Sequence, residues 1–154
     1  MRLGVIGDTH GLLRPWALEQ LAGCELILHA GDVGGVEVLD GLRDIAPVIA
    51  VRGNTDRGPW ASALPVVEAV EIGGLWFYLI HDLNELDIDP AAAGFQVVIH
   101  GHSHCPASTR RKGVLYFNPG SAGPRRFKLP IALGVIDIAG GEANPKLIEF
   151  AQAA

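Results

Sequence analysis

Four apolar segments of this chain end in the same way, and this repeated ending constrains the fold more than any other feature. Each segment is rich in β-branched residues or leucine and ends in a glycine that is followed by a polar residue able to bind metal. The segments are RLGVIGD at 2–8, ELILHAGD at 25–32, PVIAVRGN at 47–54 and FQVVIHGH at 95–102. Continuous apolar runs of this kind indicate strands covered on both faces. The polar residues would then follow the strand ends, where open α/β sheets place their ligands.

The rest of the chain divides into helical signals in the first part and further strands in the second. Proline, glycine and capping residues predict short helices over 14–23, 36–45 and 89–94. Strands without clear helices between them are predicted at 75–81, 113–117, 131–138 and 146–151. Gly140-Gly141 is expected in a hairpin connection. Two sheets packed face to face with helices outside accommodate both parts, and no linker is evident, so we expect one domain over residues 1–154.

Composition narrows the function classes. The 154 residues are 49% hydrophobic and 19% charged, which fits a compact soluble protein and excludes a disordered one. The formal net charge of −5 provides no general basic field, so stable binding of duplex nucleic acid is not expected. No apolar run reaches membrane-spanning length, and the N-terminus lacks the pattern of a signal peptide. The two cysteines suggest no disulfide framework. We expect a cytoplasmic protein.

Seven polar residues after the strand-like runs form the candidate site. They are Asp8, His10, Asp32, Asn54, His81, His102 and His104. In both Asp8-x-His10 and His102-x-His104 the partners are two residues apart, so in extended backbone they would project to the same side. Several members follow a glycine, whose missing Cβ lets the backbone approach a charged centre closely.

Seven such residues are more than one ion normally needs, and they suit two ions with one bridging carboxylate. The set contains histidine, aspartate and asparagine but no thiolate, which favours a borderline or hard divalent ion over a structural cysteine-rich zinc site. Mn²⁺ is the expected ion, with Ni²⁺, Fe²⁺, Zn²⁺ and Mg²⁺ as alternatives. Two such ions against two aspartates leave a net positive centre, which would attract an anionic ester.

Each piece taken alone has an ordinary structural explanation. A single Gly-Asp or Gly-Asn pair is usually a turn, and His81 at a strand end could be a satisfied core histidine. The first glycine-rich turn lacks the G-x-G-x-x-G spacing of dinucleotide binding. The ordered co-occurrence of all the pieces is what favours a metal site.

The motifs GDTHG, HAGDVGG, GNTD, IHD, GHSH and NPGS resemble the successive motifs of calcineurin-like metallophosphoesterases, in particular the small single-domain bacterial and archaeal phosphodiesterase branch. The resemblance implies a four-layer αββα sandwich of two facing mixed β-sheets flanked by helices. It also implies a two-metal site, with Asp8, His10 and His104 on the first ion and Asn54, His81 and His102 on the second. Asp32 would bridge both ions, and NPGS at 118–121 would support the surrounding loops.

This resemblance implies a metal-dependent phosphoesterase, and we expect a phosphodiesterase acting on small phosphate esters or diesters. Two metals lower the pKa of a bound water, so a metal-held hydroxide at the bridging Asp32 can attack phosphorus and no protein nucleophile is required. The alternative is a non-catalytic metal-binding scaffold of the same fold in a protein complex, as in a retromer subunit that resembles this branch. A nuclease is disfavoured by the acidic balance and the short chain.

Thr55 is the main departure from the family pattern, because many larger relatives have histidine directly after the metal-binding asparagine. Threonine cannot act as an acid near neutral pH, so we expect a preference for esters with acidic leaving groups unless Asp56 or the substrate supplies the proton. Asp82, where many relatives have glycine, could tighten the second ion, oppose an anionic substrate, or be a solvated loop carboxylate.

The remaining candidates surround this set. His29 and His100 are candidates for orienting a ligand or phosphate, and a purely structural role is equally compatible with them. The candidate phosphate contacts are Arg14, Arg57, Arg125 and Arg126. Exposed apolar residues such as Trp60 and Trp76 could line a contact in a homo-oligomer, although core packing explains them equally well.

Overall fold

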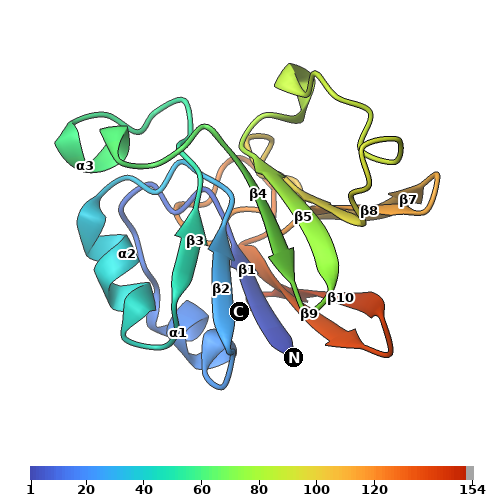
Figure 1. The fold of residues 1–154 in the computed structure, drawn as a ribbon. Coiled ribbons are helices and arrows are strands. Elements are labelled where there is room, and N and C mark those ends of the chain that lie inside the picture. Colours follow the sequence, from blue (N-terminus) through green and yellow to red (C-terminus); the bar gives the residue numbers. More distant parts are fainter. Residues whose placement is uncertain (152–154) are drawn as a thin grey trace.

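Two five-stranded β-sheets make up most of the computed structural model, which describes residues 1–151 (Figure 1). The first sheet contains β1 (Arg2–Ile6), β2 (Leu26–His29), β3 (Val48–Ala50), β9 (Ala132–Ala139) and β10 (Glu142–Glu149). The second contains β4 (Val67–Ile72), β5 (Leu75–Ile80), β6 (Val97–Ile99), β7 (Ala107–Arg111) and β8 (Val114–Asn118). Their strand orders are β10-β9-β1-β2-β3 and β4-β5-β6-β8-β7.

Both sheets are mixed, with parallel strands beside antiparallel ones. β1, β2 and β3 run parallel in the first sheet, and β5, β6 and β8 run parallel in the second. β9, β10, β4 and β7 pair antiparallel with their neighbours. The parallel strands of both sheets point toward the same end of the molecule, the top in Figure 1. The loops that follow them therefore meet at one edge of the sandwich.

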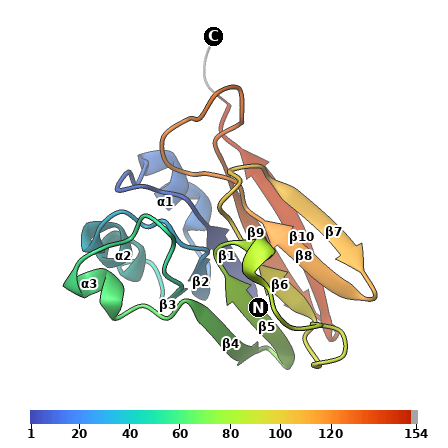
Figure 2. The same cartoon turned by 90° about the horizontal axis from the view of Figure 1, so that it is seen from above.

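The main core lies between the two sheets. Side chains from both inner faces fill it, including the fully buried Leu28, Phe77, Ile99 and Phe117. A second apolar layer lies between the first sheet and the helices α1 (Pro15–Leu21), α2 (Val36–Arg43) and α3 (Pro59–Ser62). Figure 2 shows these helices on the side of β1, β2 and β3 that faces away from the second sheet. The α/β fold of two facing mixed sheets expected from the sequence is confirmed.

The outer face of the second sheet has a thinner cover than expected. It consists of the short 3-10 helix η1 (Leu83–Glu85) and the following turns, and Leu83, Leu86 and Phe95 pack against Tyr78 and Val98. The prediction of a helix over 89–94 is wrong, because this segment forms turns. A six-residue segment is too short to repay helix nucleation without tertiary packing.

Besides the 3-10 helix η1, three elements were not anticipated from the sequence. α3 is a single turn, and β7 is a largely exposed edge strand of mostly polar sequence, ASTRR. β4 alternates between exposed and less exposed residues, so its period of two could have been recognised. The hairpin at Gly140-Gly141 is present, and it joins β9 to a strand that begins four residues earlier than the predicted 146–151.

A buried hydrogen-bond chain joins the loops that follow β1 and β2. The Gly31 N–H donates to His29 Nδ1 at 3.0 Å, so the ring proton lies on Nε2 and is donated to Thr9 Oγ1, also at 3.0 Å. Thr9 Oγ1 in turn donates to the Val33 carbonyl at 2.7 Å. Both ring nitrogens of His29 and the Thr9 hydroxyl therefore have hydrogen-bond partners. Burial lowers the pKa of His29 to about 3. His29 therefore acts as a neutral structural link between the two loops.

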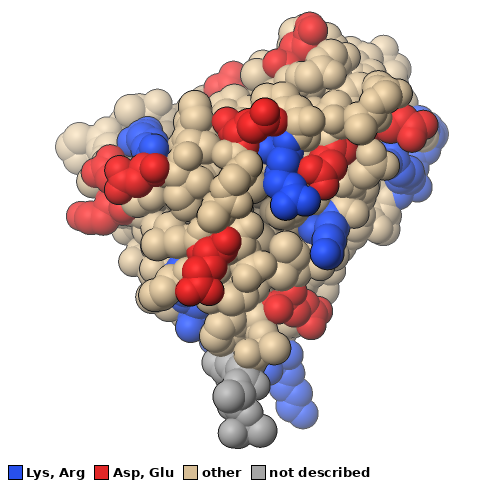
Figure 3. Space-filling model, turned by 90° about the horizontal axis from the view of Figure 1, so that it is seen from below, with Lys and Arg blue, Asp and Glu red and all other residues tan. Residues whose placement is uncertain are grey.

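The surface lacks a dominant charged patch on the face drawn in Figure 3, where acidic and basic side chains are interspersed. Trp76 is exposed, whereas Trp60 is partly buried against the helical layer. Within residues 1–151, no helix has both the length and the apolar character required to cross a membrane.

Packing between β9 and β8 depends on a glycine. A Cβ at Gly134 would collide with the ring of the fully buried Phe117. We therefore expect Gly134→Ala to lower the free energy of unfolding by about 1–3 kcal/mol through overpacking. Urea denaturation should also show that Gly134→Ala with Phe117→Leu costs less than the sum of the single changes, because the smaller side chain makes room. Additive costs would contradict this contact.

The His29 link predicts a specific pH dependence of stability. The unfolded chain takes up a proton at this residue near pH 6.5, whereas the folded chain does so only near pH 3. The stabilisation is thus complete above pH 6.5 and decreases as pH falls below it, by up to about 1.4 kcal/mol per pH unit. The control is His29→Asn, whose Oδ1 can still accept from Gly31. Urea unfolding between pH 7.5 and 5 should give a steeper loss for the unsubstituted protein, and parallel profiles would contradict the prediction.

Candidate metal centre

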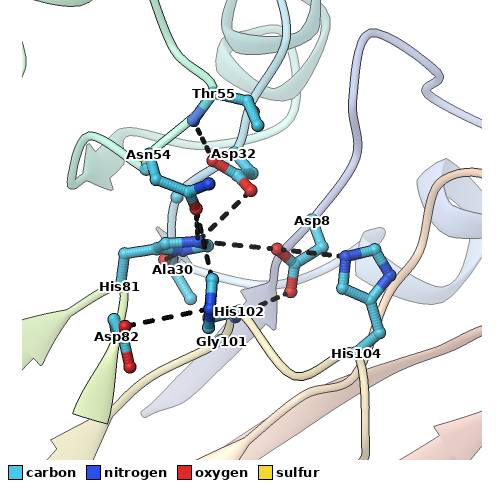
Figure 4. A network of polar contacts seen from close by, with 12 residues as sticks. Asp8, Ala30, Asp32, Asn54, Thr55, His81, Asp82, Gly101, His102 and His104 are labelled. Atoms are coloured by element: carbon cyan, nitrogen blue, oxygen red, sulfur yellow. Dashed lines mark hydrogen bonds and ion pairs between the residues drawn. The ribbon is translucent and has the colours of Figure 1, made fainter. Parts of the chain in front are cut away.

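The loops at the shared edge bring all seven predicted side chains into one cluster. Figure 4 labels each of them except His10. Three come from the first sheet, with Asp8 and His10 after β1 and Asp32 after β2. Asn54 follows β3, and the second sheet supplies the rest: His81 directly after β5, then His102 and His104 after β6. Two groups of side chains could each hold an ion, with ligand atoms within 4.8 Å of one another: Asp8, His10 and His104, and Asp8, Asp32 and His81.

The backbone of this cluster differs from the extended conformation expected from the sequence. Positive φ angles between 46° and 71° occur at Asp8, His10, Asp32, His102 and His104. The pairs Asp8-x-His10 and His102-x-His104 were expected in extended backbone, and this expectation is wrong. Tight turns bring these side chains to the cluster instead. The left-handed conformation is disfavoured for residues other than glycine, although Asp and His tolerate it better than most. Such conformations persist only where surrounding structure enforces them.

His81 Nε2 lies among acceptor oxygens. Its Nδ1 is 2.8 Å from the Ala30 carbonyl, which can only accept, so Nδ1 carries a proton. In the neutral ring Nε2 is then an acceptor, yet it lies 3.0 Å from Asn54 Oδ1, 3.2 Å from Asp32 Oδ2 and 3.9 Å from Asp8 Oδ1. Acceptors gather in this way around a proton or a cation. A histidine whose other nitrogen donates to a carbonyl is also the usual arrangement of a metal ligand.

The second group is equally rich in unpartnered acceptors. His10 Nε2 and His104 Nε2 are 3.3 Å apart, and His104 Nε2 is 3.6 Å from Asp8 Oδ1. Asp8 Oδ1 and His104 Nδ1 are buried with no hydrogen-bond partner among residues 1–151. A buried polar atom without a partner is costly. A divalent cation accepting a lone pair from Asp8 Oδ1 would remove that cost for this oxygen, so the carboxylate and imidazole atoms present fit a metal ion.

The pKa values of the two carboxyl groups, Asp8 and Asp32, are shifted in opposite directions. Burial raises the pKa of Asp8 to about 7, with the neighbouring Asp32 charge adding to the increase. Burial also acts on Asp32, but protonated His81 beside it and the hydrogen bond from the Thr55 N–H outweigh this effect and lower the pKa of that carboxyl. Asp32 Oδ2 lies 3.2 Å from His81 Nε2 and 3.8 Å from His10 Nε2, so it adjoins both groups. Asp8 also adjoins both, and the bridging role of Asp32 stays a prediction.

Glycines allow the backbone to approach these carboxylates. A Cβ at Gly53 would collide with Asp32, both at its backbone N and at Oδ1. A Cβ at Gly101 would lie 3.1 Å from Asp8 Oδ2, the oxygen that accepts from the His102 N–H at 3.1 Å. At Gly53 and Gly101, which precede Asn54 and His102, a larger residue would press against a carboxylate of the cluster.

The NPGS segment holds the loops in place. Ser121 Oγ donates to the Asp8 carbonyl at 2.9 Å. The Asn118 amide donates to the Gly101 carbonyl at 3.2 Å and to Ser103 Oγ at 3.1 Å. These contacts fasten the loops after β1 and β6 to the end of β8, as expected for a supporting motif.

Thr55 and Asp56 have different roles in the structure. Thr55 contributes its backbone N–H to Asp32 Oδ1 at 2.9 Å. Asp56 is buried and accepts from the N–H groups of Val33, Gly34 and Gly53 at 3.2, 3.0 and 2.9 Å. Because backbone donors surround both of its oxygens, Asp56 holds the loops, and the basis for expecting it to donate a proton is removed.

Of the remaining candidates, His29 belongs to the structural link described above. Arg57 is exposed and makes no side-chain hydrogen bond or ion pair with residues 1–151. His100 is half-buried, and burial lowers its pKa to about 4. Asp82 Oδ2 lies 3.8 Å from His102 Nε2, which places its charge beside the candidate second ion.

The candidate phosphate-binding arginines have different surroundings in the structure. Arg14 donates to the Gly123 carbonyl through Nε and Nη2 at 3.4 and 3.2 Å, so it anchors a loop. Arg125 and Arg126 instead line a pocket of about 280 Å³ together with His10 and His104. Only their sequence position after NPGS hinted at this. A second pocket of about 230 Å³ adjoins Asn54, His81 and Asp82.

Comparisons with known proteins agree with this geometry. Residues 1–141 match the family model of the calcineurin-like phosphoesterase superfamily domain. A probable metallophosphoesterase of Methanocaldococcus jannaschii is 36% identical over 134 residues, covering 79% of this chain and 68% of the relative. The structure of an archaeal phosphodiesterase superposes with a TM-score of 0.81 and 25% identity, covering 96% of this chain and 100% of the other.

The fold is shared more widely. Vps29 of Chaetomium thermophilum has a TM-score of 0.78 at 20% identity, with 97% of each chain covered. At that identity the likeness shows the fold alone. The family model, in contrast, spans the loops that carry all seven clustered side chains. The chain therefore belongs to the calcineurin-like phosphoesterase superfamily.

Proposed function

We propose that this chain is a single-domain, metal-dependent phosphodiesterase that hydrolyses small phosphate diesters at a two-metal centre. Asp8, His10 and His104 would hold one ion and Asn54, His81 and His102 the other, with Asp32 between them. Mn²⁺ is the proposed ion, with Ni²⁺, Fe²⁺, Zn²⁺ and Mg²⁺ as alternatives, and the cytoplasm is the proposed location. The cluster of acceptor atoms around His81 Nε2 and Asp8 Oδ1 carries this proposal.

The chemistry follows from the cluster and its surroundings. When bound, divalent ions would activate water as the nucleophile and neutralise charge on the phosphoryl oxygens. The His81 Nδ1 bond to Ala30 directs Nε2 into the cluster, and the Thr55 N–H orients the Asp32 carboxylate. The pocket beside His10 and His104 leaves room for a substrate group. No serine or cysteine is required as a nucleophile.

The leaving group receives little help from this chain. Thr55 is exposed beside the cluster, and both oxygens of Asp56 accept hydrogen bonds from backbone N–H groups. With no acid at this position, we propose that the enzyme acts best on diesters whose leaving group is itself acidic.

A non-catalytic scaffold is the competing function, because Vps29 has the same fold. The filled set of candidate ligands favours the enzyme. Metal uptake without hydrolysis of any diester would instead favour the scaffold.

Metal removal and return provide the direct test. Chelated protein should hydrolyse an aryl phosphodiester only after Mn²⁺ or another divalent ion is returned, and the matching monoester more slowly. Asp32→Asn should lower the restored rate by about 100-fold or more, because it removes a negative charge from the cluster.

The matched control is Asp40→Asn, on the exposed face of α2, which should keep full activity. Metal content measured by elemental analysis should fall in Asp32→Asn and stay unchanged in the control. Equal turnover by Asp32→Asn and the unsubstituted protein would contradict the proposal.

The missing acid can be tested by supplying one. Thr55→His leaves the backbone N–H that binds Asp32 in place and adds an imidazole beside the cluster. We expect faster hydrolysis of diesters with poor alkoxide leaving groups, with a gain of up to about 100-fold, and little change for nitrophenyl esters. Thr55→Gln, which cannot supply a proton near neutral pH, is the control. A uniform change across a leaving-group series would show that Thr55 does not limit proton donation.

A further inference from the structure

We propose that residues 124–128, PRRFK, form a substrate-binding loop for a nucleotide diester. The loop would bind the part of the substrate that does not react, namely a nucleoside that carries a further phosphate. Arg125 and Arg126 would contact that phosphate, and Phe127 would stack on the base. This inference rests on the proposed phosphodiesterase function and specifies its substrate class.

The pocket beside the cluster places the loop within reach of a bound substrate. Pro124, Arg125 and Arg126 line the same pocket of about 280 Å³ as His10 and His104. A diester whose reacting phosphate lies at the cluster could therefore extend its other substituent between the two arginines. Figure 2 shows the segment between β8 and β9, in orange, looping outward on the side of the molecule away from β4.

The base of the loop is fastened to the cluster. The Arg14 guanidinium binds the Gly123 carbonyl, and the Ala122 N–H donates to the Gly7 carbonyl at 3.1 Å. A Cβ at Gly123 would collide with the backbone of Asp8 and Thr9, so the loop starts in direct contact with the turn that carries Asp8. The arginines that follow are thus held at a defined distance from the candidate ligands.

The loop concentrates positive charge in an otherwise acidic chain. The chain has a net charge of −5, yet three of the four residues at 125–128 are basic. Arg125, Arg126 and Lys128 are exposed, and within residues 1–151 no acidic side chain forms an ion pair with them. Arginine matches the geometry of a phosphate with paired N–H groups. These unneutralised cations beside a phosphoesterase centre point to a substrate with more than one phosphate.

Phe127 presents an exposed aromatic ring next to these basic residues. Its side chain is 89% exposed, the most exposed of the large hydrophobic residues. The Leu129 N–H donates to the Arg126 carbonyl at 3.1 Å, which closes a turn with Phe127 at its corner and a φ of 55°. An aromatic ring displayed among cations is the arrangement that binds single-stranded nucleotides, where bases stack on the ring and phosphates contact the basic groups.

Three diesters with the same p-nitrophenyl leaving group test the inference with metal-loaded protein. They are methyl p-nitrophenyl phosphate, thymidine 5′-(p-nitrophenyl phosphate) and its 3′-phosphorylated form. Because the leaving group is constant, differences in kcat/KM report only the non-reacting part. We expect kcat/KM to increase along this series, by about tenfold or more for the added phosphate. That last gain should shrink at high salt, because the contacts are exposed.

Variants separate the two contacts. Arg125→Gln with Arg126→Gln should remove the gain from the 3′-phosphate, about tenfold or more, and should lower kcat/KM for the methyl ester far less. Phe127→Ala should lower kcat/KM for both thymidine esters about fivefold or more and spare the methyl ester. Lys112→Gln, in the hairpin before β8 at the opposite end of that strand, removes an exposed charge as a control and should change nothing.

The outcomes distinguish this inference from the function on which it rests. Turnover of all three esters at equal kcat/KM, or an equal loss for all three in the loop variants, would overturn the nucleotide assignment and leave the phosphodiesterase standing. No turnover of any ester with any ion would overturn the proposed function and the inference with it. Unchanged metal content in the loop variants is expected, because no loop residue belongs to the candidate ligand set.

Discussion

A buried group of acceptor atoms is stable only if something supplies a positive charge to it. Asp8 Oδ1, Asp32 Oδ2, Asn54 Oδ1 and His81 Nε2 meet within hydrogen-bonding or ion-pair distance, and His81 itself is the only potential donor among them. Protonating His81 relieves part of the repulsion, and metal ions would relieve all of it. Asp8 Oδ1 has no hydrogen-bond partner among residues 1–151, which adds to this need for positive charge. The rest of the fold can be understood as the structure that enforces this arrangement.

Two sheets are needed because no single strand end offers enough ligands. The parallel strands of both sheets end at one edge, so β1, β2 and β3 deliver one half of the cluster and β5 and β6 deliver the other. The loops then turn through left-handed conformations that are unfavourable in isolation. Hydrogen bonds from Ser121, Asn118, Asp56 and His29 hold these turns. Much of the polar network therefore supports the candidate ligands through backbone atoms and neighbouring loops.

The proposed substrate selection depends on a different part of the chain. The proposed metal cluster would recognise a phosphoryl group through charge, which every phosphate ester offers. The pocket beside His10 and His104 is lined by Arg125 and Arg126, whose segment is anchored to the turn of Asp8 by Gly123. Under this proposal the reacting centre and the substrate-binding loop would lie on separate segments of the chain.

The sequence by itself determined the fold class, the family and the identities of the clustered residues, because apolar runs ending in Gly-polar pairs are local signals and their order is specific. It did not determine the backbone at the site: extended pairs were expected, whereas Asp8 and His102 have positive φ angles and are held by contacts between distant loops. The thin turn layer over the second sheet and the edge strand β7 likewise follow from packing that no local pattern encodes. Only the tertiary structure assigned Arg14 to a loop anchor, Asp56 to backbone donors and Arg125 to the pocket. A charged residue's role depends on which partners fold against it, and those partners lie far away in the sequence.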